Sequence, residues 1–121
     1  MNQYHYALVL YRSGHEQANV GVILWQPTER DLLFLLCERS ERFVRFFWRF
    51  DEAEYSRQVQ ELRERLKGIR DVESATSLNE VLDLAFPDPN DPLTHSEIRG
   101  GISPSPAARV QQLYGEYVRG F

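Results

Sequence analysis

The sequence has 121 residues, of which 42% are hydrophobic, and a formal net charge of −4 at pH 7. This length is that of one domain with a single core, and the apolar content excludes a wholly disordered chain. The acidic balance argues against a nucleic-acid coat protein and a membrane-surface protein, because both usually carry an excess of basic residues. We therefore expect a single domain over residues 1–121.

Three strands are predicted in the first third of the chain, over residues 4–11, 19–25 and 31–38. Short turns separate them, and this arrangement favours an antiparallel meander. Gly21, inside the second strand, predicts a bulge or a close backbone approach. Apolar side chains alternate onto both faces of these strands. Both faces should therefore be covered, by helices of the chain or by another subunit.

Four helices are predicted from residues that can cap their first turns. The capping residues are Ser40, Asp51, Ser77 and Ser105. The first helix covers residues 41–49. The second has Phe50 and Tyr55 at the spacing of a hydrophobic staple and stops at Gly68.

A weak fourth strand is predicted over residues 94–103, where Gly100 and Gly101 lower its stability. Strands and helices are thus segregated along the chain. The sequence predicts an α+β fold, with a three-stranded antiparallel meander and a weak fourth strand packed with about four helices.

Cys37 is the one cysteine of the sequence, so no disulfide can form within the chain. We expect a reducing, cytoplasmic location and interpret Cys37 as a small buried hydrophobe. We expect no membrane association, because no apolar run approaches the ~20 residues of a membrane helix and no signal-peptide pattern is visible.

Three histidines, His5, His15 and His95, stand apart in the sequence. None pairs with a second histidine or a cysteine at ligand spacing, so we expect neither a metal site nor a cofactor. We also predict that these histidines do not converge with Glu16 and Asn19 on one pocket.

The segment that begins at Glu16 resembles a bacterial family catalogued as domain of unknown function three-zero-three-seven. Members carry a Glu, two spacers and Asn-Val-Gly-Val, matched here by Glu16 and residues 19–22. They also open with a tyrosine-bearing strand, as residues 4–11 do. They close with a proline-flanked strand and a helix ending in Tyr-Val, matched by residues 102–106 and 117–118.

The resemblance implies little chemistry, since the family has no established activity. Some members are associated with neighbouring genes for HipA-like kinases. This association implies a toxin–antitoxin or regulatory setting.

Glu16 and Asn19 are the polar pair of the family motif. One interpretation is a substrate-anchoring site where a strand begins. The other is structural: Asn19 bonds backbone groups at the turn and Glu16 meets an arginine. We favour the structural interpretation.

Arginines and aromatic residues interleave between residues 39 and 50. On a helical wheel, one face of this segment is apolar and predicts a core face: Phe43, Phe46, Phe47 and Phe50. The arginines lie opposite, and Val44 with Trp48 forms a second apolar ridge. A tryptophan beside arginines is typical of protein–protein hot spots. The predicted partner-binding residues are Arg42, Val44, Arg45, Trp48 and Arg49.

Three functional hypotheses follow. The first is a non-enzymatic protein-interaction or regulatory module, homodimeric because the second sheet face needs a cover. A terminal helix over residues 107–118 is the alternative cover. The second hypothesis is a small hydrolase or nuclease that uses Glu16 and Asn19. The third is a nucleic-acid-binding protein that uses Arg42, Arg45 and Arg49.

Overall fold

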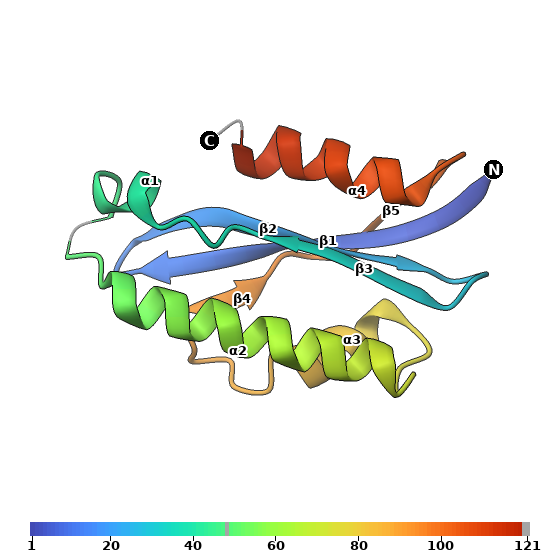
Figure 1. Cartoon of the computed structure of the whole chain (residues 1–121), viewed down its shortest axis with the longest axis horizontal. Helices are drawn as coiled ribbons and strands as arrows, with labels where there is room; N and C mark the ends of the chain where they lie inside the picture. Colours follow the sequence, from blue (N-terminus) through green and yellow to red (C-terminus); the bar gives the residue numbers. More distant parts are fainter. Residues whose placement is uncertain (48, 120–121) are drawn as a thin grey trace.

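The computed structural model describes residues 1–47 and 49–119. Within these residues an antiparallel sheet lies between two layers of helices (Figure 1). Helices α2 and α3 cover one face, and α4 covers the other. The predicted α+β class is confirmed.

The sheet has five strands in the described residues. Strands β1 (Asn2–Ser13), β2 (Glu16–Gln26) and β3 (Asp31–Leu36) form the predicted meander. Strands β4 (Leu93–His95) and β5 (Arg99–Ser103) both pair with β1, on the side away from β2. The single fourth strand that we predicted is therefore two strands. They are interrupted at Ser96, whose hydroxyl accepts a hydrogen bond from the backbone N–H of Leu8 at 2.8 Å.

Both features that were predicted for Gly21, a bulge and a close backbone approach, are present. Val9 pairs with Gly21 and Leu10 pairs with Asn19, so β2 has one extra residue, Val20, at a bulge. A Cβ atom on Gly21 would lie 2.9 Å from the carbonyl oxygen of Leu35. Only glycine allows β3 to approach β2 this closely.

Helix α2 (Glu52–Asp71) begins as predicted and ends later than predicted. The Asp51 side chain accepts a hydrogen bond from the N–H of Glu54 at 3.1 Å. The prediction that Gly68 ends the helix is wrong. Gly68 does not adopt a positive φ, and Glu73 does so instead, at 48°. The N–H of Ser74 then bonds the Ile69 carbonyl, which completes a Schellman ending.

Helix α3 (Leu78–Ala85) and helix α4 (Pro106–Tyr114) also begin at predicted caps. Ser77 accepts from the N–H of Glu80, and Ser105 accepts from the N–H of Ala108. Helix α4 continues into η1 (Gly115–Arg119), a π-helical turn.

The terminal helix packs on β2 and β3 and so covers the second face of the sheet. Its buried residues include Val110 and Leu113, and Val118 is buried in η1. This is the alternative that the sequence left open beside self-association. This cover removes the argument for a homodimer that rested on the second sheet face, while the homodimer itself stays a prediction.

The helix predicted over residues 41–49 is much shorter in the structure. Helix α1 spans only Glu41–Val44, and the Ser40 hydroxyl makes no capping hydrogen bond. Arg49 has a positive φ of 57°, which a continuous helix excludes. The chain turns here because several of its phenylalanines pack together in one cluster beside α2. Phe46 consequently leaves the predicted core face and is 41% exposed.

Candidate functional site

An aromatic cluster anchors the connection between β3 and α2. Phe43 and Phe47 are buried. The Phe43 ring lies 5.3 Å from the ring of Tyr55, and the Phe47 ring lies 5.4 Å from the ring of Tyr11. The predicted staple is present too, with the Phe50 and Tyr55 rings 5.4 Å apart. The buried side of this connection is therefore fixed against both β1 and α2.

Tyr55 also ties the beginning of the connection to α2. Its buried hydroxyl donates a hydrogen bond to the carbonyl oxygen of Cys37. Burial is the main cause that raises the pKa of Tyr55. The phenol therefore stays protonated and keeps its role as a donor throughout the neutral range.

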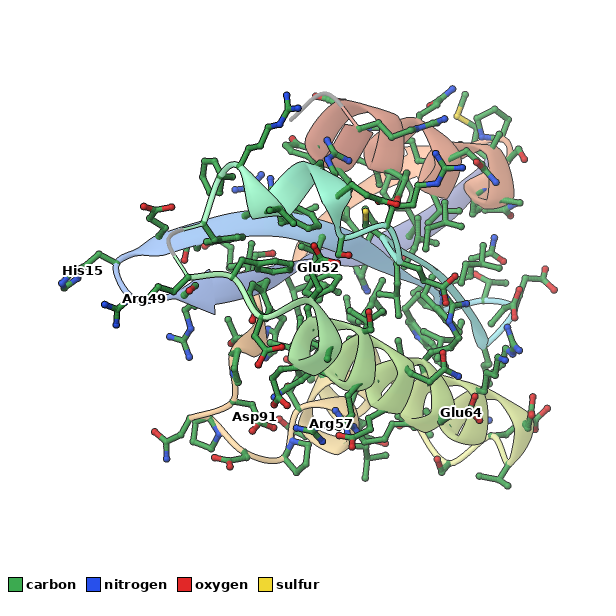
Figure 2. The ribbon with its side chains drawn as sticks, turned by 60° about the vertical axis from the view of Figure 1, so that its left-hand side comes forward. His15, Arg49, Glu52, Arg57, Glu64 and Asp91 are labelled. Carbon is green, nitrogen blue, oxygen red and sulfur yellow. The ribbon has the colours of Figure 1, made fainter. Side chains whose placement is uncertain are left out.

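The other side of the same connection faces solvent. Val44 is 47% exposed and Phe46 is 41% exposed, and both rank among the exposed large hydrophobic residues. Arg45 and Arg49 are exposed beside them. We name these four residues the arginine–aromatic ridge. Figure 2 shows Arg49 at the same end of the molecule as His15 of the β1–β2 turn. Trp48, which was predicted to belong to this surface, lies outside the described residues.

Arg42 is placed differently from the other predicted partner-binding residues. It is partly buried, and its Nη2 donates to the carbonyl oxygen of Val118 at 2.7 Å and to that of Arg119 at 3.5 Å. These carbonyls belong to the last turn of η1, whose acceptors lack partners within the helix. Arg42 thus joins α1 to the C-terminal helix. Nothing local in the sequence indicates this contact, because the partners are far apart along the chain.

A cavity of about 640 Å³ lies between the β3–α1 connection and the C-terminal helix. Its lining comprises three arginines, two glutamates, a tyrosine and a cysteine: Cys37, Glu38, Arg39, Glu41, Arg42, Tyr114 and Arg119. Burial, then Cys37, raises the pKa of Tyr114 to about 12, while Arg42 and Arg119 oppose this rise. Glu38 is engaged by Arg63 at 2.9 Å. The arginines of the lining outnumber its two glutamates, one of which is paired with Arg63, so the cavity has a small positive excess.

The charge of the molecule is distributed unevenly. Residues 39–49 include four arginines and one acidic residue, Glu41, which gives this segment a net charge of +3. Since the whole chain carries −4, the remaining residues carry −7. The connection is therefore a basic region on an acidic protein.

The two polar residues of the family motif are not brought together into a site. Glu16 is exposed at the first position of β2, and it pairs with none of the described arginines, contrary to the expected contact. The Asn19 amide donates to the carbonyl oxygen of Tyr117 at 3.1 Å. Asn19 therefore has the predicted kind of bond, to backbone, although the partner lies in η1 and not in the turn.

The three histidines lie at separate places. His5 lies in β1 opposite Trp25, His15 is exposed in the β1–β2 turn, and His95 bonds the Ser96 carbonyl. Among the described residues, no group of three or more His, Cys, Asp or Glu side chains is arranged to hold a metal ion. No helix in this part of the chain has the length and apolar character needed to cross a membrane.

A second cavity, of about 660 Å³, lies at the other end of α2, beside the β2–β3 turn. Charges of both signs line it, with Arg30 and Arg70 among the acidic residues Glu29, Asp31, Asp71 and Glu73. Its carboxylates outnumber its arginines, whereas arginines outnumber carboxylates in the first cavity. The ridge and the cavity next to it are therefore the better candidate site.

A family model described as "Protein of unknown function (DUF3037)" matches residues 7–118. The chain belongs to this family. The match begins within β1 and ends within η1, and so includes most of the sheet and all of the arginine–aromatic ridge. It confirms the resemblance seen at Glu16 and residues 19–22. Comparison with curated proteins and with solved structures found no match.

Proposed function

We propose that this protein is a non-enzymatic protein-interaction module. Its partner contributes an acidic segment with apolar side chains, which docks on the arginine–aromatic ridge. The observation that carries the proposal is the joint exposure of Val44 and Phe46 in the same short segment as the exposed Arg45 and Arg49. Aromatic residues and arginines are enriched at protein interfaces.

The rigidity of the connection supports this function. Phe43 and Phe47 pack beneath the ridge, so its backbone has little conformational entropy to lose when a partner binds. A binding surface needs such a fixed base if a few side chains are to supply most of the affinity.

The charge pattern supports an acidic partner. The net +3 of residues 39–49 attracts carboxylates and repels basic surfaces. The same charge opposes a two-fold contact between two ridges, because their arginines would face one another. A long nucleic acid is a poorer fit, because the rest of the protein is acidic and would repel phosphates that extend beyond this segment.

The enzyme alternative has less support from the geometry. Asn19 is engaged by Tyr117, and Glu16 lies exposed in the hairpin. A regulatory setting near a kinase or toxin, a cytoplasmic location and a homodimer stay predictions, and the last is taken up below.

The test uses two labelled synthetic peptides. One carries leucine and tryptophan anchors between glutamates, and its twin has lysines in place of the glutamates. We expect the acidic peptide alone to bind. Val44→Ser with Phe46→Ser should weaken binding about 30-fold or more, as expected for an interface hot spot.

The control replaces two other exposed apolar residues, Val72→Ser with Leu84→Ser, and should leave binding unchanged. Equal binding of both peptides, or equal losses in both double variants, would contradict the proposal. Any partner captured from cells supports it only if capture also depends on Val44 and Phe46.

A further inference from the structure

The sheet has a free edge at β5. This strand pairs with β1 along one side, and none of the described strands pairs along its other side. Residues 99, 100 and 102 are exposed, and Ile102 reaches 68% exposure. A free strand edge presents unpaired backbone groups that can bond another strand.

The two faces of β5 differ. A Cβ atom on Gly101 would point at the hydroxyl of Tyr4, which bonds Arg109 of α4, so Gly101 faces the α4 layer. A Cβ atom on Gly100 would instead meet His5 at 3.2 Å. Since side chains alternate along a strand, Gly100 and Ile102 share the face away from α4.

A shallow hollow lies on that same face. Its volume is about 390 Å³, and its lining is Met1, Gln3, His5, Gly100, Gly101 and Ile102. The absence of a side chain at Gly100 leaves part of this space open. An apolar side chain placed opposite Gly100 would fill it.

We propose that β5 pairs with β5 of a second copy of this chain, antiparallel and centred on Gly101. In this register each Ile102 lies opposite Gly100 of the other copy and fills the hollow there. Arg99 lies opposite Ser103, so no like charges face each other. The strand is thus complementary to itself, and the two-fold contact closes after two copies.

The proposed dimer leaves the arginine–aromatic ridge free. Strand β5 pairs with residues 2–6 of β1, whereas the ridge is anchored near Tyr11 at the other end of that strand. Figure 1 places α1 and the N-terminus at opposite ends of the molecule. A dimer would therefore present two ridges to an acidic partner.

Sedimentation velocity over a range of micromolar concentrations tests the proposal on the full chain. We expect a concentration-dependent dimer for the wild type. Ile102→Lys should weaken association at least tenfold, because it places a charge where the isoleucine packs. The matched control is Val72→Lys, since Val72 is 73% exposed and lies just after α2. This variant should associate as the wild type does.

Hydrogen exchange of the wild type gives a second readout that needs no variant. The amides of residues 99–103 should become more protected as the protein concentration rises. A wild type that stays monomeric throughout would overturn the proposal. So would a dimer that Ile102→Lys leaves intact, or whose β5 amides gain no protection. Because peptide binding is measured separately, these outcomes do not depend on the ridge.

Discussion

Helix α2 and the connection just before it are both rich in arginine and in apolar residues at helical spacing, yet they fold differently. Helix α2 runs for 20 residues between the Asp51 cap and the ending at Glu73. In the connection, α1 lasts four residues and Ser40 gives no side-chain cap. A helical spacing of apolar residues therefore produces a long helix only where capping residues at its ends agree with that spacing. In the connection, packing of aromatic residues on Tyr11 and Tyr55 decides the path of the chain.

The largest effect should come from removing the centre of the aromatic cluster. Phe43 is fully buried, and Phe43→Ala should lower the free energy of unfolding by about 3–5 kcal/mol. Urea denaturation measures this loss. A loss below about 1 kcal/mol would mean that the cluster does not hold the connection.

High pH should weaken the contact between the two regions. The pKa of Tyr55 is raised mainly by burial, and that of Tyr114 is raised to about 12. Unfolded tyrosines titrate near pH 10, so above that pH the unfolded chain loses protons that the folded chain keeps. The contribution of these tyrosines to the free energy of unfolding should therefore be constant between pH 7 and about pH 9 and fall as pH rises towards 12.

Tyr55→Phe is the variant that isolates this effect. It removes the titrating group and the hydrogen bond to Cys37. The variant should be less stable at neutral pH and should lose less additional stability at high pH. If the free energy of unfolding of the variant fell with pH as steeply as that of the wild type, Tyr55 would not contribute to the pH dependence.

The N-terminal caps of α2 and α1 should also differ in their contribution to stability, although the expected effect is smaller. Asp51→Ala should cost about 1 kcal/mol, because the N–H of Glu54 loses its acceptor. Ser40→Ala should cost much less, since the Ser40 hydroxyl accepts no capping bond. Thermal unfolding of both variants checks this difference, and equal losses would remove the distinction between the two helix starts.

A substitution at the C-terminal end of α2 should stabilise the protein. Glu73 has a positive φ of 48°, a conformation that glycine adopts without a steric cost. Glu73→Gly should therefore raise the free energy of unfolding by about 0.5–1 kcal/mol. A destabilised variant would indicate that the Glu73 side chain makes a contribution larger than the strain.

Local signals account for what the sequence predicted well. Asp51, Ser77 and Ser105 each bond an amide three residues ahead, so each cap can be recognised from neighbouring residues. The bulge and the close backbone approach at Gly21 could likewise be predicted, because a glycine inside an apolar strand usually marks one of these two features. The alternation of apolar residues predicted that both sheet faces are covered. It could not distinguish α4 from a second subunit, because either would bury the same face.

Contacts between distant parts of the chain account for what the sequence missed. A helical wheel assumes an unbroken helix, so it placed Phe46 in the core, although the chain turns before Arg49. The bond from Arg42 to the Val118 carbonyl has no local signature. In the candidate site, the exposure of Val44 could therefore be predicted, whereas the attachment of Arg42 to η1 could not.

Phe46→Ser tests the central claim most directly, with stability and acidic-peptide binding measured on the same preparation. Phe46 contacts Phe47 with ring centroids 4.9 Å apart but is substantially exposed. We predict a loss of only about 0.5 kcal/mol in the free energy of unfolding, and binding weakened about tenfold. A loss of stability comparable to that of Phe43→Ala, or unchanged peptide binding, would contradict the account of a fixed base beneath a binding ridge.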